Sequence, residues 1–122
     1  MIKNLWKITS FYCMNGHEEP IPFTVQRGDS SFFACPHYFL LSNEHPDGHL
    51  PGEKACHNRL SFSDAEKIVS QLSRVIEEDL EDDCIADYTN LRFTCGFNKV
   101  TVLKYSPKEI RIGVVNQMAV RN

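Results

Sequence analysis

The stretch SDAEKIVSQLSRVIEEDL, residues 63–80, decides the fold class because it encodes one long amphipathic helix. Apolar residues recur in it at spacings of three and four, which places them along one face of a helix. The members of this face are Ala65, Ile68, Val69, Leu72, Val75, Ile76 and Leu80. Ser63 and Glu66 have the spacing of a capping box, so the Ser63 hydroxyl is predicted to cap the helix. A helix with one apolar face needs a second layer against which to bury it.

Three strands are expected after this helix. Residues 91–95, 99–105 and 110–114 are rich in β-branched and aromatic side chains and alternate between apolar and polar. The short stretches 96–98 and 106–109 contain Gly, Asn, Ser and Pro, which favour turns. Because short turns join antiparallel neighbours, we predict a three-stranded antiparallel meander with the helix across its apolar face.

The part before the helix is predicted to be β-rich. Strand composition marks residues 5–12, 21–26 and 31–34, and the residues Arg-Gly-Asp-Ser at 27–30 predict a tight turn between the last two. Two Pro and two Gly make residues 43–52 an irregular loop. The expected fold is therefore α+β, with a β-rich lobe in residues 1–60 and a helix plus three-stranded sheet in residues 61–122, packed as one compact unit.

Three thiols and one imidazole in the N-terminal half predict a metal site. The chain has five cysteines, an odd number that a complete set of disulfides cannot use. Soft sulfur donors together with imidazole suit one tetrahedral Zn²⁺ ion. The predicted ligands are Cys13, His17, Cys35 and Cys56. His37 is the reserve histidine, His57 is a weaker one, and the alternative for the whole set is buried thiols with a solvated histidine.

Four protein ligands would close the coordination shell, which predicts a structural ion and a non-enzymatic protein. The competing hypothesis is a small metal- or thiol-dependent enzyme, in which three cysteines hold the ion with water, Glu18 or Glu19 is the base and His17 is free. Iron of the rubredoxin type is the alternative metal. Cys84 and Cys95 are expected to be packing residues, and a redox pair is the alternative for them.

Charge is distributed unevenly along the chain. Residues 1–60 carry five basic against six acidic residues (−1), residues 61–90 two against nine (−7), and residues 91–122 six against one (+5). Lys99, Lys104 and Arg111, interleaved with aromatic residues, are candidates for binding single-stranded nucleic acid. The alternative is that they form the solvated side of a sheet. Because the net charge is −3, we expect a protein partner ahead of a nucleic acid.

Residues 8–60 resemble a zinc-ribbon or rubredoxin-like module of the kind found in small bacterial proteins. The resemblance rests on Tyr-Cys-x3-His at 12–17, Ala-Cys-Pro at 34–36 and Ala-Cys-His-Asn-Arg-Leu at 55–60. It implies that residues 1–60 are a zinc-ribbon-like lobe, stabilised by metal and used to contact protein or nucleic acid without catalysis. No apolar run has the roughly 18 residues of a membrane helix, and the first residues lack a signal-type segment, so we expect a cytoplasmic location.

Overall fold

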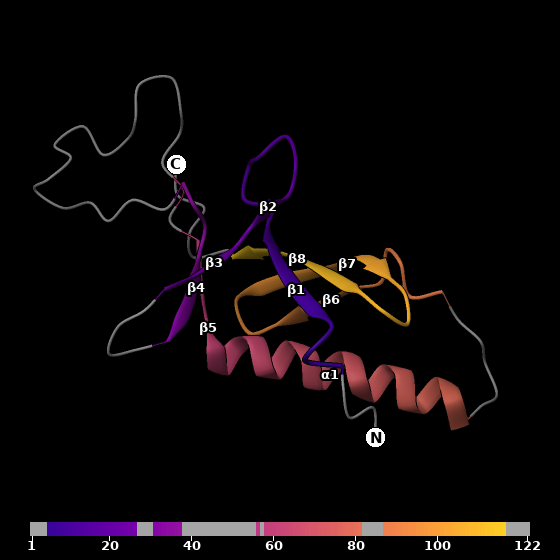
Figure 1. Ribbon diagram of the computed structural model, residues 1–122. Coiled ribbons are helices and arrows are strands. Elements are labelled where there is room, and N and C mark those ends of the chain that lie inside the picture. Colours follow the sequence, from indigo (N-terminus) through magenta and orange to yellow (C-terminus); the bar gives the residue numbers. More distant parts are fainter. Residues whose placement is uncertain (1–4, 27–30, 38–55, 57, 82–86, 117–122) are drawn as a thin grey trace, which may run out of the picture.

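The computed structural model describes residues 5–26, 31–37, 56, 58–81 and 87–116. In these ranges it contains one helix and two sheets, which confirms the α+β class (Figure 1). The elements are β1 (Thr9–Cys13), β2 (Ile21–Pro22), β3 (Thr24–Gln26), β4 (Phe32–Ala34), β5 (Arg59–Ser61), α1 (Phe62–Glu81), β6 (Arg92–Cys95), β7 (Asn98–Tyr105) and β8 (Ile110–Asn116). The predicted turn at 27–30 and loop at 43–52 lie outside the described residues.

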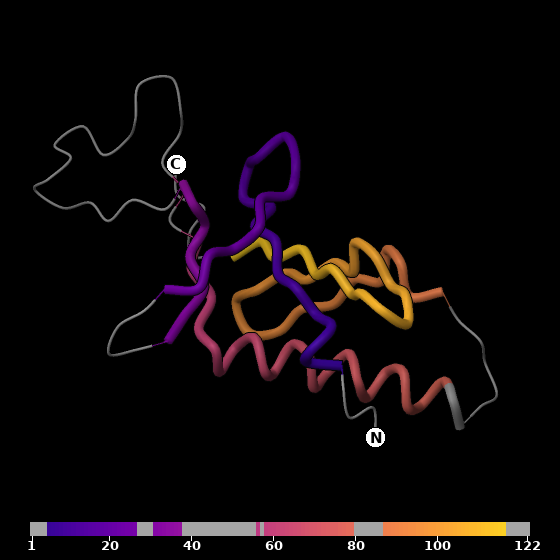
Figure 2. Tube along the Cα trace, viewed as in Figure 1, coloured from indigo at the N-terminus to yellow at the C-terminus, as the bar shows by residue number. Residues whose placement is uncertain are grey.

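The larger sheet has five strands in the order β2-β1-β8-β7-β6. Strands β6, β7 and β8 form the predicted antiparallel meander, with Phe93 opposite Val100 and Val102 opposite Ile112. The meander is extended by β1, which runs parallel to β8, so the indigo N-terminal strand lies beside the yellow C-terminal one in Figure 2. The sheet draws strands from both segments, 1–60 and 61–122, and the division of the chain at residue 60 stays a prediction.

The apolar face of α1 packs against this sheet as predicted. Ala65, Ile68 and Leu72 are fully buried, and Val75 is partly buried at the edge of the same core. The sheet contributes the buried residues Phe11, Val100, Val102, Ile110, Ile112 and Val114. Full burial of each large aliphatic side chain stabilises the fold by about 1.5–3 kcal/mol, so this core is the main source of stability. No helix in the described ranges is long and apolar enough to cross a membrane.

The helix begins earlier than the sequence analysis predicted, and its cap is a different serine. Helix α1 starts at Phe62, and the Asp64 N–H donates to Ser61 Oγ over 3.1 Å, so Ser61 and not Ser63 is the capping residue. Ser61 and Asp64 have the same capping spacing that Ser63 and Glu66 have. The centres of the Phe62 and Phe33 rings are 4.6 Å apart. The sequence pattern does not reveal this contact.

The predicted strand at 21–26 is split between the two sheets. Its first part, β2, pairs with β1, and its second part, β3, joins a separate antiparallel sheet with the order β3-β4-β5. The break follows Pro22, which has no N–H to donate to a strand ladder. Phe23 lies between β2 and β3, where the chain passes from one sheet to the other, and its N–H donates to Phe11 O over 3.0 Å. Strand β5 was not predicted because its three residues are too short to show a pattern.

The first predicted strand is shorter than expected. Residues 5–8 form a turn, and β1 begins at Thr9. The Thr9 N–H donates to Trp6 O over 3.3 Å, and the Thr9 hydroxyl donates to Leu5 O. These local bonds satisfy the backbone without a neighbouring strand, which explains why β-rich composition alone misplaced the start.

Candidate metal centre

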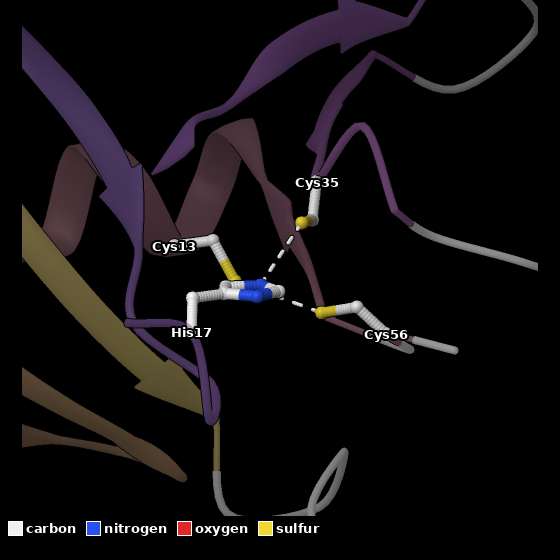
Figure 3. Close-up of side chains that lie close together, drawn as sticks. All are labelled: Cys13, His17, Cys35 and Cys56. Atoms are coloured by element: carbon white, nitrogen blue, oxygen red, sulfur yellow. Dashed lines mark hydrogen bonds between the residues drawn. The ribbon is translucent and has the colours of Figure 1, made fainter. Parts of the chain in front are cut away.

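Four donor atoms from distant parts of the chain meet at one place. The thiol sulfurs of Cys13, Cys35 and Cys56 and a ring nitrogen of His17 all lie within 4.8 Å of one another. Cys13 Sγ is 3.6 Å from Cys56 Sγ, and Cys35 Sγ is 3.4 Å from His17 Nε2. The four side chains point toward a common centre (Figure 3). The cluster that the sequence predicted is therefore close enough to hold a metal ion.

The donors come from the junction of the two sheets. Cys13 is the last residue of β1, opposite Val114 of β8 in the larger sheet. Gly16, with a positive φ of 69°, bends the following loop so that His17 returns toward Cys13. Cys35 directly follows β4 and Cys56 lies three residues before β5, so both flank strands of the smaller sheet. An ion bound here would connect one sheet to the other.

Two of the donor separations match those around a tetrahedral ion, and neither fits a disulfide. With Zn–S bonds of about 2.3 Å and Zn–N bonds of about 2.0 Å, neighbouring donors in a tetrahedron lie about 3.5–3.8 Å apart. The observed separations of 3.6 Å between Cys13 and Cys56 and 3.4 Å between Cys35 and His17 are close to these values. A disulfide needs sulfurs about 2.05 Å apart, and the cysteines of this cluster are free thiols.

Backbone N–H groups surround the sulfurs. Each of the three sulfurs accepts a hydrogen bond from the N–H two residues later in the chain. The donors are Asn15 for Cys13, His37 for Cys35 and Asn58 for Cys56. Such bonds favour the negatively charged sulfur, which is the form that binds metals. The cluster therefore combines convergent donors with local bonds that stabilise thiolates.

The three sulfurs also control one another's protonation. Hydrogen bonds from the Cys35 and Cys56 thiols, helped by the Asn15 N–H and the Asn58 side chain, lower the pKa of Cys13 from 9.0 to about 2. The contact with Cys13 raises the pKa of Cys56 to about 11. Contacts with Cys13 and then Cys56, together with burial, raise the pKa of Cys35. Without an ion, these shifts favour a cluster of one thiolate, Cys13, and two thiols.

Asn58 belongs to the site, although the sequence analysis did not select it. Its side chain is completely buried, and Nδ2 donates to Cys13 Sγ over 3.2 Å and to Val114 O over 3.3 Å. The only sequence signal is its position two residues after Cys56. An asparagine there is compatible with an ordinary turn, so the sequence gives no reason to bury it.

The other candidate ligands lie beside the cluster or outside the described ranges. The His37 ring is 5.6 Å from the His17 ring, and the His37 carbonyl accepts the Cys56 N–H over 2.7 Å. Glu18 and Glu19 are exposed in the loop after His17. Cys95 packs against the core between helix and sheet, away from the other thiols. His57 and Cys84 fall outside the described residues.

The three cations proposed for nucleic acid are exposed on the larger sheet, but two of them share one carboxylate. Lys104 and Arg111 are opposite each other on β7 and β8. Lys104 Nζ lies 3.0 Å from the Glu109 carboxylate, and Arg111 Nε lies 2.6 Å from it. The hydrogen bond from Arg111 has the larger effect and the one from Lys104 the smaller, and both lower the pKa of Glu109. The Arg111 guanidinium also lies 5.8 Å from the centre of the Tyr12 ring. Lys99 is exposed near the start of β7.

Comparisons with known proteins do not add to this geometry. No protein-family model matches the chain, and no curated protein or solved structure is significantly similar to it. Its belonging to a zinc-ribbon family is therefore not shown. The feature that best indicates a chemical function is the cluster of Cys13, His17, Cys35 and Cys56, which lie close enough to hold a metal ion.

Proposed function

We propose that the protein binds one Zn²⁺ ion through Cys13, His17, Cys35 and Cys56, and that the ion has a structural role in a non-enzymatic module. The observation that carries this proposal is the convergence of four donor atoms within 4.8 Å from segments far apart in the sequence. Unrelated buried thiols have no reason to meet a histidine nitrogen in this way. Three thiolates and one imidazole form a common donor set for structural zinc.

The donor set favours zinc over iron. Soft thiolates with imidazole in a tetrahedral arrangement suit zinc, whereas mononuclear rubredoxin-type iron takes thiolates alone. The antiparallel pair β4 and β5 supports the zinc-ribbon-like character of the lobe, since Cys35 follows the first strand and Cys56 precedes the second. Two adjacent strand ends thus present sulfur to one point.

A structural role follows from the filled coordination shell and from burial. A catalytic zinc site keeps one position for water, whereas here four protein atoms would fill the tetrahedron. The exposed fractions of Cys13, Cys35 and Cys56 are 0%, 2% and 5%. A lowered cysteine pKa also suits a nucleophile, but a reactive thiol must be accessible, and Cys13 is fully buried. The low pKa of Cys13 therefore supports metal binding and not thiol catalysis.

The partner that we propose is a protein. Because Lys104 and Arg111 share the Glu109 carboxylate, part of their charge is already neutralised before any phosphate approaches. A cleft of about 300 Å³ lies where the two sheets approach each other. It is lined by Trp6, Thr9, Ser10, Phe11, Tyr12, Pro22, Phe23, Phe33 and Phe62. Aromatic surfaces of this kind are enriched at protein contacts.

Metal analysis with cobalt substitution tests the proposal. Purified protein is expected to contain about one zinc per chain, and the Co²⁺ form is expected to show the intense visible bands of a four-coordinate, thiolate-rich site. A protein that binds neither ion, or a Co²⁺ spectrum that changes when water-exchanging anions are added, would contradict a closed structural site. Cys95→Ser is the matched control, since Cys95 is a free thiol that packs outside the cluster.

A further inference from the structure

Asn58 contacts all three cysteines of the cluster. Its Nδ2 donates to Cys13 Sγ over 3.2 Å, and its backbone N–H donates to Cys56 Sγ. Its carbonyl accepts the Cys35 N–H over 3.2 Å. A single residue thus links the end of β1, the end of β4 and the segment that leads into β5.

The side-chain amide of Asn58 can take only one orientation. Nδ2 donates to Val114 O over 3.3 Å, and a carbonyl oxygen only accepts, so the nitrogen and not the oxygen must face both Val114 and Cys13. This orientation leaves Asn58 Oδ1 buried without a hydrogen-bond partner among the described residues. A buried acceptor without a partner costs stability. The fold therefore tolerates a local cost in order to keep an N–H donor against the Cys13 sulfur.

We propose that Asn58 is the positioning residue of the metal centre, which fixes the Cys13 sulfur and offsets thiolate charge when the ion is bound. This inference rests on the proposed zinc site. Three thiolates and one divalent ion carry a net charge of about −1, and N–H donors around the sulfurs reduce its cost in a buried site. Because Nδ2 also holds Val114 O, the same amide ties the cluster to β8 of the larger sheet.

The test compares zinc dissociation constants, measured by competition with a chelator, for two variants of Asn58. Asn58→Leu keeps the side-chain volume and removes the donor, and Asn58→Asp places a carboxylate oxygen against the sulfur. Loss of such an outer contact weakens metal binding by about 10–100-fold, and the aspartate variant should be the weaker of the two. In the Co²⁺ form of Asn58→Leu, the sulfur-to-cobalt charge-transfer band should move to longer wavelength because the sulfur becomes a stronger electron donor.

Asn98→Leu is the matched control, because Asn98 is a second buried asparagine with an unpartnered Oδ1, on β7 opposite Cys95 and Asn116. It should bind zinc like the unmodified protein. The inference is overturned if Asn58→Leu keeps both the affinity, within about twofold, and the cobalt spectrum. If Asn58→Leu folds only with metal, the rate of zinc loss to excess chelator gives the same comparison. A failure of the unmodified protein to bind zinc would instead refute the proposed function.

Discussion

Zinc binding should release about two protons per ion near pH 8, and not the three that three independent thiols would release. The perturbation is the addition of one equivalent of Zn²⁺ to metal-free protein. Cys13, whose pKa is lowered to about 2, is already a thiolate at this pH. Cys56, whose pKa is raised to about 11, and Cys35, whose pKa is also raised, still hold their protons. The ion displaces the two protons that remain.

The same count sets the pH dependence of zinc affinity. Between pH 7.5 and 8.5, the logarithm of the apparent association constant should rise by about two per pH unit as the two thiol protons are displaced. Proton release can be measured with a pH indicator in weakly buffered solution, and the slope by chelator competition. A release of three protons, or a slope near three, would refute the single-thiolate description of the metal-free cluster.

The stability of the metal-free protein provides a second check on the same description. The Cys13 pKa is lowered in the folded state, so its contribution is present above the ordinary thiol value of 9.0 and is lost as the pH falls below it toward 2. The Cys56 pKa is raised, so its contribution is full below 9.0 and is lost as the pH rises through about 11. Stability from these thiols should therefore be greatest near pH 9, which denaturant unfolding across pH can measure.

Three further predictions test the site and the fold. In elemental analysis, Cys35→Ser should contain much less than one zinc per chain, whereas Cys95→Ser should keep about one. Equal zinc content in the two variants would contradict the ligand assignment. Removal of the ion should change the fluorescence of Trp6, the only tryptophan, because Trp6 lines the cleft between the sheets. Ser61→Ala should lower the free energy of unfolding by about 1 kcal/mol, whereas Ser63→Ala should change it by less than about 0.5 kcal/mol; the reverse order would refute the observed cap.

The helix and the meander could be predicted because their signals are local and repeated. The apolar positions of α1 recur over about four helical turns, and Ala65, Ile68 and Leu72 are all fully buried in the structure. Alternation along β7 and β8 has the same strength, and the turns between the strands carry their own residue preferences. Only the cap was misplaced, since Ser61 and Ser63 both satisfy the short capping pattern.

The pairing of distant strands could not be predicted. Strand β1 pairs in parallel with β8, with Thr9 opposite Ile110. The residues of neither strand indicate that the other is its neighbour. The switch of the chain at Phe23 from one sheet to the other depends on the same long-range contact, because Phe23 bonds to Phe11 of β1. Strand composition reports that a segment is extended, but not which sheet it joins.

The donor residues could be predicted from their chemistry, whereas the residue that organises them could not. Cysteine and histidine have few reasons to gather in one lobe, so Cys13, His17 and Cys35 were recognisable without coordinates. Asn58 has the same composition signal as any turn asparagine. Its contacts with the Cys13 sulfur, the Cys35 N–H and the Val114 carbonyl exist only after both sheets have been assembled.

The two buried clusters explain why an ion would matter in one part of this protein and not in the other. The helix and the larger sheet share an extensive aliphatic core, which includes Leu60 of β5 and has Phe33 of β4 packed against it, so it also anchors the smaller sheet. The second cluster has only the three cysteines at its centre, with Ile21 and Phe23 partly buried against them. So little apolar surface cannot order the His17 loop by burial alone. Coordination bonds would supply that missing stability, so the ion and the His17 loop should become ordered together.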